Sequence, residues 1–355
     1  MLEAWCGARR RSCARQGVRM IPSILRALSA TVVLLSPVIF SSSASLLSSN
    51  VQASAASRGH RCAGETATLV GTTGPDRLVG TSGADVIWGG LGRDVIRGRG
   101  GNDIVCGADG PDVINTGHGA DVIYGGPGAD HIADPGGGRM TVWAGTGSDI
   151  VHANGMADSD YALIRGGYGR DEIVGGGGAE TYLDGGPGRD VLRGREGYAQ
   201  MVTGTGRDVA YGGTGSSQVD DLSGEGDTYY GGPKEDLAMY GQAPGAVRVS
   251  LETGRGQLIS GTKYDQLVDV EGVYGSWYAD ELTGNAGSNH LFGDVGNDVL
   301  QGGDGGDIVD GADGDDIVDG GLPSGTAPWP VGDYVIGGNG TDSCTGGETT
   351  DGCEG

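Results

Sequence analysis

Aspartate recurs every nine residues through the first regular stretch of the chain. From Gly71 to Ala133 the sequence divides into nines with Asp at the sixth place each time. These residues are Asp76, Asp85, Asp94, Asp103, Asp112, Asp121 and Asp130. A Leu, Ile or Val stands two places after every one of them. A fixed period of this kind decides the fold, so it is read before local propensities.

The chemistry of such a period is cation binding. Carboxylates that recur along a regular structure repel one another and need a counter-ion. Carboxylates beside the free carbonyl oxygens of glycine turns are the ligands of a hard cation that takes six to eight oxygens, which favours Ca²⁺ over Mg²⁺. The sequence therefore predicts multiple Ca²⁺ ions between neighbouring repeats.

The elements that position these carboxylates are a turn and a short strand. Glycines at the first, second and fourth places suit backbone with positive φ. The last three residues of each nine are β-prone, and alternation buries the middle one. We expect two repeats per coil, with residues 18 apart stacked in two columns. The predicted fold is all-β, a parallel β-roll (β-solenoid) of nonapeptide repeats.

This run resembles the RTX (hemolysin-type) repeat GGxGxDxUx, a calcium-binding β-helix repeat. Residues 89–97 and 125–133 match it at every defined position, and the resemblance extends over most of 67–240 and 280–342. It implies a secreted calcium-binding protein. A glycine-rich disordered linker is the alternative, but disorder would not keep an aliphatic residue two places after each Asp.

From Asp134 the period loosens. We assign the sixth place to Met140, Asp149, Ala162, Asp171, Glu180, Asp190, Gln200, Asp208, Ser217, Asp227 and Asp236. Every second turn keeps Asp while the turns between lose it, so this segment is predicted to bind calcium along one edge only. Random decay of the repeats is the alternative.

Residues 241–279 break the nines, and we interpret them as a β spacer continuous with the roll. A second block, 280–355, resumes the period and ends in a cap; 56–240 holds the first block. Asn289 stands at a sixth place and predicts a weaker site. The candidate ligands are Asp76, Asp85, Asp94, Asp103, Asp112, Asp121, Asp130, Asp149, Asp171, Asp190, Asp208, Asp227, Asp280, Asp298, Asp307 and Asp316.

Composition agrees with a solenoid. The chain of 355 residues has 76 Gly, only two Phe and a net charge of −24, which leaves little for an ordinary core. Such acidity argues against a nucleic-acid partner. Residues 1–55 combine arginines, an apolar run and the triplet Ala53–Ala55, and predict a signal peptide for secretion to the extracellular space, with no membrane contact in the mature form. A membrane anchor is the alternative, although the run is short for a bilayer.

Four cysteines remain after this segment: Cys62, Cys106, Cys344 and Cys353. An even count in an oxidising compartment predicts disulfides. Of the three possible pairings we favour Cys62–Cys106 and Cys344–Cys353, because each ties down one end of the roll.

No H-E-x-x-H, G-x-S-x-G or P-loop motif is present, so we expect no enzyme. The leading hypothesis is a calcium-binding structural protein. The alternative is an adhesion module for a cell-surface or carbohydrate partner, suggested by an outward row that includes Trp88, Tyr124 and Trp143. In a plainer interpretation, the segment around Cys62 folds over that row.

Overall fold

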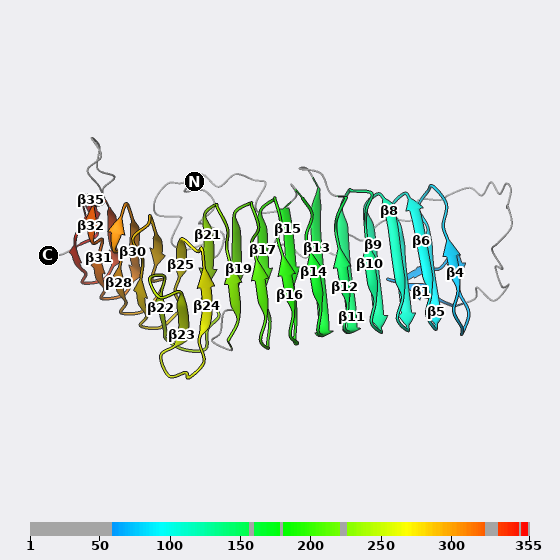
Figure 1. Ribbon diagram of the computed structural model, residues 1–355, viewed down its shortest axis with the longest axis horizontal. Coiled ribbons are helices and arrows are strands. Elements are labelled where there is room, and N and C mark those ends of the chain that lie inside the picture. The colour runs from blue at the N-terminus through cyan, green and yellow to red at the C-terminus, as the bar shows by residue number, and fades with distance from the viewer. Residues whose placement is uncertain are drawn as a thin grey trace. The chain divides into compact units, whose positions relative to one another are not determined.

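Strands that alternate between two sheets make up the part of the chain that the structure describes. The computed structural model describes residues 59–155, 160–177, 180–220, 226–323, 333–347 and 349–353. Within these ranges every regular element is a strand (Figure 1), and no helix is long and apolar enough to span a membrane. The chain divides into Met1–Ser49 and Asn50–Gly355. The predicted signal segment lies outside the described residues.

One sheet, called sheet I, has 15 strands. Their order in space follows the chain. They are β3 (Leu69–Val70), β5 (Val86–Leu91), β7 (Ile104–Asp109), β9 (Asp121–Pro127), β11 (Met140–Gly147), β13 (Tyr161–Gly169), β15 (Glu180–Asp184), β17 (Ala199–Val202), β19 (Ser217–Asp220), β21 (Asp236–Met239), β25 (Gly272–Tyr274), β27 (His290–Phe292), β30 (Ile308–Asp313), β33 (Tyr334–Asn339) and β35 (Thr349–Asp351).

The other sheet, called sheet II, has 16 strands. In spatial order they are β4 (Arg77–Val79), β6 (Val95–Gly100), β8 (Val113–His118), β10 (His131–Ala133), β12 (Ile150–His152), β14 (Glu172–Val174), β16 (Val191–Arg193), β18 (Val209–Tyr211), β20 (Thr228–Tyr230), β24 (Asp265–Val268), β23 (Arg255–Leu258), β22 (Val247–Ser250), β26 (Glu281–Thr283), β28 (Val299–Gln301), β31 (Ile317–Asp319) and β34 (Ser343–Thr345). Two small pairs complete the strands: β1 (Arg61–Cys62) with β2 (Glu65–Thr66), and β29 (Asp304–Gly305) with β32 (Leu322–Pro323).

The strand register confirms two repeats per coil. Ile87 of β5 stands beside Val105 of β7, and Ile96 of β6 beside Ile114 of β8, so these strands pair in parallel with the strand 18 residues on. The predicted all-β parallel roll is therefore confirmed.

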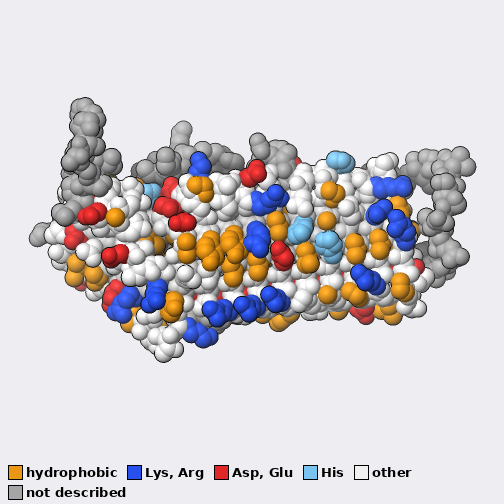
Figure 2. Space-filling model, viewed as in Figure 1, with side chains coloured by type: hydrophobic (Ala, Val, Ile, Leu, Met, Phe, Trp, Pro, Cys, Tyr) orange, Lys and Arg blue, Asp and Glu red, His pale blue; other side chains and the backbone are white. Residues whose placement is uncertain are grey.

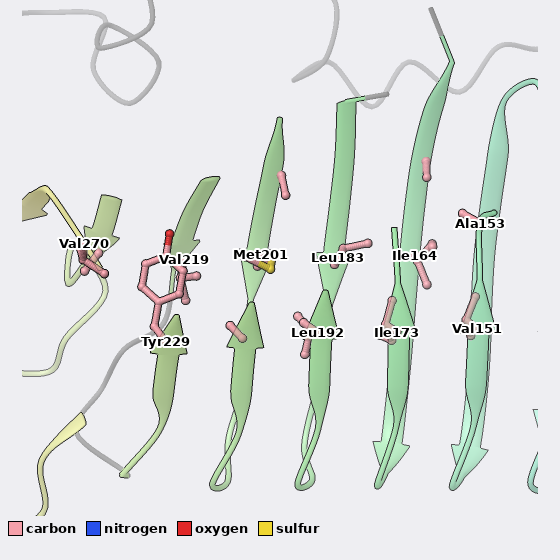
Figure 3. Close-up of a cluster of buried hydrophobic side chains, with 14 of the residues drawn as sticks. Val151, Ala153, Ile164, Ile173, Leu183, Leu192, Met201, Val219, Tyr229 and Val270 are labelled. Atoms are coloured by element: carbon pink, nitrogen blue, oxygen red, sulfur yellow. The ribbon is translucent and has the colours of Figure 1, made fainter. Parts of the chain in front are cut away.

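The core is one aliphatic column per sheet, formed by the eighth residue of each repeat. Ile164, Leu183 and Met201 from sheet I face Val151, Ile173 and Leu192 from sheet II (Figure 3), and all six are fully buried. Each such side chain contributes roughly 1.5–3 kcal/mol by leaving water. This explains why an aliphatic residue follows each Asp at a fixed distance.

The segment that breaks the period inserts a hairpin into sheet II. β22 pairs antiparallel with β23, and β23 antiparallel with β24. The outer strands of this insert then rejoin the parallel sheet, β24 against β20 and β22 against β26. Sheet I runs past the insert directly from β21 to β25.

Both predicted disulfides are confirmed. Cys62 is bonded to Cys106 and Cys344 to Cys353, each with a Cα–Cα distance of 5.7 Å. No cysteine is free among the described residues. The first bridge fastens the β1–β2 hairpin to β7, and the second joins β34 to the residues after β35. The second bridge lies at the end of the sheets, whereas the first holds the hairpin against β5 and β7, close to the other end.

Candidate metal centre

The sixth residue of each repeat lies where a turn enters the next strand, and its side chain points inward. Turns that pass from sheet I to sheet II place these residues in one column, called the first column. Turns that pass from sheet II to sheet I form the second column. The candidate ligands occupy both, and all but Asp76 and Asp85 are buried.

Within a column, one carboxylate oxygen joins neighbouring coils. The amide of Asp94 donates to Asp112 Oδ1 at 2.8 Å, and the amide of Asp112 donates to Asp130 Oδ1 at 2.8 Å. The same bond, at 2.7–2.8 Å, continues from Asp130 through Asp149, Asp171, Asp190 and Asp208 to Asp227. In the second column it joins Asp85 to Asp103 and Asp103 to Asp121. Oδ1 is thus an acceptor within the roll.

The second oxygen, Oδ2, is buried without a hydrogen-bond partner in most of these carboxylates. The group includes Asp94, Asp103, Asp112, Asp130, Asp149, Asp171, Asp190, Asp236, Asp298, Asp307, Asp316, Asp333 and Asp342. A buried charged oxygen that accepts no hydrogen bond is costly. Its regular recurrence therefore points to a missing positive partner.

The space around this oxygen is kept open by the first glycine of the turn. A Cβ added to Gly89 would lie 2.9 Å from Asp94 Oδ2 and 2.3 Å from the Gly107 carbonyl oxygen of the next coil. Gly107 itself stands in the same way between Asp112 Oδ2 and the Gly125 carbonyl oxygen. Oxygens of carboxylates and main-chain carbonyls therefore converge on space that any side chain would fill, and this donor set fits Ca²⁺.

Side chains alone do not form a metal site in the described residues. No group of three or more His, Cys, Asp or Glu able to hold a metal occurs in the described ranges. A site made here would combine few carboxylates with backbone carbonyl oxygens. That excludes the thiolate and imidazole sets typical of structural zinc among these residues.

Burial also raises the pKa of these carboxyl groups in the metal-free protein. For Asp130, Asp190 and Asp298 the pKa rises to about 7, chiefly because burial disfavours the charged form. Hydrogen bonds from backbone amides lower it, and neighbouring aspartates in the column raise it. A bound cation would remove both unfavourable contributions.

Three candidate ligands differ from the rest. Asp76 Oδ2 accepts from the Thr72 amide at 2.6 Å, and Asp85 Oδ2 from the Thr81 amide at 2.6 Å. Asp280 Oδ2 likewise accepts from the Ser276 amide. In these turns the carboxylate is satisfied by its own turn.

In the middle of the second column, our assignment of Glu180 and Gln200 to the sixth place was wrong. Ala162 pairs with Thr181, and Thr181 with Ala199, so Thr181 and Ala199 occupy that place and are buried. Glu180 is exposed, and Gln200 donates to Asp220 on the surface. Counted through Thr181, the turn spans 175–181 and is one residue longer than a regular turn such as 71–76. The buried alternation, and not the acidic residue type, therefore sets the register.

The corrected second column carries no carboxylate at its sixth places through this segment. Its sixth places are Met140, Ala162, Thr181, Ala199 and Ser217. The first column keeps Asp149, Asp171, Asp190 and Asp208 beside them. The two edges of the same coils therefore differ in charge at the sixth place, although Asp134 and Asp160 lie elsewhere in the second-column turns that end at Met140 and Ala162.

Two column residues escaped the sequence analysis. The Asp227 amide donates to Asp265 Oδ1 at 3.0 Å, and the Asp236 amide to Glu271 Oε2 at 3.0 Å. Leu267 and Val273 follow them by two places and are buried. That spacing of carboxylate and aliphatic residue is the signal that would have found them inside the irregular segment.

At Glu271 the turn itself is missing. The chain passes from β24 to β25 through residues 269–271 alone, which leaves a notch of about 470 Å³ lined by Glu235, Glu271 and His290, among others. His290 Nδ1 lies 2.7 Å from Glu235 Oε1 there. The second column therefore lacks a stacked pair of turns at this point.

A family model described as the RTX calcium-binding nonapeptide repeat matches residues 70–105, 107–132, 163–183, 181–198, 274–309 and 292–322. These stretches include most of the turns described above. No curated protein matches the chain.

Proposed function

We propose, from the premise that this chain carries RTX calcium-binding nonapeptide repeats in a β-roll, that it is a secreted protein which folds and becomes rigid when calcium binds between its stacked turns. The observation that carries this proposal is the buried Oδ2 atom that recurs, without a hydrogen-bond partner, beside a glycine and a carbonyl oxygen of the next coil. The two disulfides support an oxidising, extracellular location.

In each column aspartate, the two carboxylate oxygens have different roles. Oδ1 accepts a hydrogen bond from a backbone amide of the neighbouring coil, and this bond fixes the spacing of the turns. Oδ2 supplies negative charge, and the turn carbonyl oxygens supply neutral ligands. Calcium, when bound, neutralises a column of like charges that would otherwise oppose coil stacking. Each site adds about 2.7 kcal/mol of stability at a hundred-fold excess of calcium over its Kd.

We propose a structural role rather than catalysis. The recurring carboxylates already have one periodic purpose, which gives no reason to assign them to acid–base chemistry. Two stacked pairs among the outward aromatic residues do not favour the carbohydrate-binding alternative. Tyr124 stacks on Trp143 with ring centroids 4.7 Å apart, and Tyr211 on Tyr230 at 4.9 Å. Ring faces that cover one another are closed to a sugar.

The face of the roll shown in Figure 2 is mixed in composition. Figure 2 shows hydrophobic groups interleaved with Lys, Arg and His over the visible face. Arg193 covers the Tyr211 ring at 4.5 Å, and His60 lies 5.6 Å from the Trp88 ring. The second contact supports the view that the segment around Cys62 covers the start of the aromatic row. We therefore advance no second function.

The test is unfolding of the full chain in chelator, in calcium and in magnesium. We expect calcium to increase β-structure in the circular dichroism spectrum and to raise the Tm strongly, with a much smaller effect of magnesium because its rigid octahedral preference suits these turns poorly. An equal Tm and equal β content in chelator and in calcium would contradict the proposal.

A further inference from the structure

The turns of this roll adopt two conformations, distinguished by the backbone of their second residue. In most turns that residue has positive φ, as at Gly90 (113°), Gly126 (112°) and Gly186 (86°). The conformation persists where the residue is not glycine: Arg99, Ala108, Arg195, Asp294 and Ala312 have φ between 70° and 84°. We call these open turns. Among the described turns of regular six-residue length, four, with Thr72, Thr81, Ser276 and Asn285 at the second place, are not of this kind, and we call them closed.

The φ of the second residue determines where its amide points. In closed turns the amide donates to the sixth residue of the same turn, at 2.6 Å from Thr81 to Asp85 Oδ2 and at 2.6 Å from Asn285 to Asn289 Oδ1. The Thr81 hydroxyl adds a second bond to the same Asp85 oxygen at 3.0 Å. In open turns the amide instead reaches the next coil, as from Gly167 to the Gly185 carbonyl at 3.1 Å.

The consequence for the carboxylate is direct. Asp171 and Asp190, which end open turns, have a buried Oδ2 without a hydrogen-bond partner. In the closed turns of Asp76, Asp85 and Asp280 that oxygen is engaged by one or two donors of its own turn. To bind a cation, these three residues would first have to give up short hydrogen bonds.

The closed turns also share one position in the fold. Turns 71–76 and 80–85 make the first coil of the first block, and turns 275–280 and 284–289 make the first coil of the second block. Neither coil follows a regular pair of turns, because the described chain begins with the β1–β2 hairpin and the second block follows the irregular segment. A carboxylate there lacks a stacked turn on one side, and closure satisfies it.

We infer that the second residue of each turn decides whether the turn takes calcium, and that the first coil of each block is a metal-free cap. The inference rests on the proposed function, since it assigns which turns serve it. Asp76, Asp85 and Asp280 then have a structural role, and the calcium column starts one coil later, at Asp94 and Asp103 in the first block.

The experiment counts bound calcium by native mass spectrometry on the full chain with two matched pairs of variants. D85N and D103N make the same change in adjacent coils of the second column. We expect D85N to keep the wild-type count and D103N to lose at least one ion. T81G removes the side chain, and with it the hydroxyl bond to Asp85, from the second residue of a closed turn. S82G places a glycine at the next residue and leaves Thr81 unchanged. We expect T81G to gain one ion and S82G to gain none.

The outcomes separate the two proposals. Equal losses in D85N and D103N, or equal counts in T81G and S82G, would overturn the division into open and closed turns. A wild-type chain that binds no calcium would instead contradict the proposed function. The folded state of each variant is checked by the Cys62–Cys106 bridge in a peptide map, which does not depend on calcium.

Discussion

The amide of Asp112 donates to Asp130 Oδ1 at 2.8 Å, and Asp130 Oδ2 is left buried without a hydrogen-bond partner. One side chain therefore both holds two coils together and presents a charge to the space between them. Substitution by Asn preserves the first role and removes the second, whereas substitution by Ala removes both.

We accordingly predict different outcomes for D130N and D130A. D130N should bind less calcium but unfold in chelator at nearly the wild-type denaturant concentration. D130A should also destabilise the metal-free roll, by about 1–3 kcal/mol, because the buried Asp112 amide loses its acceptor. Calcium counts and urea unfolding in chelator test this. D184N is the control, since Asp184 stands at the ninth place beside Arg165; a loss of calcium in D184N equal to that in D130N would count against the site.

The metal-free protein should become more stable as the pH falls. The pKa values of Asp130, Asp190 and Asp298 are raised to about 7 in the folded state from 3.8. A raised folded-state pKa means that the native state binds protons more tightly. The stabilisation is then complete below about pH 4 and is lost as the pH rises through about 7.

Urea unfolding of metal-depleted protein at pH 5.5 and pH 8 measures this directly. We expect the higher midpoint at pH 5.5. In excess calcium the order should reverse, because protons compete with the cation for the same oxygens. A metal-free protein that is more stable at pH 8 would show that these carboxylates are not the titrating groups.

Arg99 has a φ of 84°, in the region that favours glycine. Because a side chain there costs about 1–2 kcal/mol and glycine also loosens the unfolded chain, R99G should raise the free energy of unfolding by roughly 0.5–1 kcal/mol. Arg97, two residues earlier in β6, is the matched control, and R97G should lower it by roughly 0.5–1 kcal/mol. Destabilisation of similar size in both variants would argue against strain at Arg99.

The two disulfides should differ in their effect on stability. The Cys62–Cys106 bridge closes a sequence separation of 44 residues, and Cys344–Cys353 one of 9. Loop entropy predicts a larger loss for C62S/C106S than for C344S/C353S, by about 1 kcal/mol within an overall effect of about 2–4 kcal/mol. Unfolding of both double variants in calcium tests the order, and each should still respond to calcium.

The fold followed from the sequence because one feature, Asp with an aliphatic residue two places later, encodes both the turn and the buried column. Asp94 and Ile96 illustrate it, as both are fully buried. The same rule places Asp265 and Leu267, but there the glycine turn is absent, so the period could not be followed. Glu180 misled the assignment because its acidic side chain resembled a ligand, while the buried neighbour Thr181 sets the register.

The sequence did not reveal whether the amide of a turn's second residue points to its own turn or to the next coil. Thr81 and Arg99 are both non-glycine residues at the second place of a turn, yet the turn of Thr81 is closed and the turn of Arg99 is open. Thr81 holds Asp85 Oδ2 with both its amide and its hydroxyl, whereas Arg99 has no hydroxyl to make the second bond. The division between open and closed turns therefore required the structure.

The most direct measurement of the central claim is anomalous diffraction from crystals grown in calcium. We predict calcium peaks beside Oδ2 of Asp149, Asp171 and Asp190 in the first column, and none at the same level beside Ala162, Thr181 and Ala199 in the second. Peaks of equal height along both columns would mean that carbonyl oxygens suffice without the carboxylate. Absence of peaks along the first column would contradict the account as a whole.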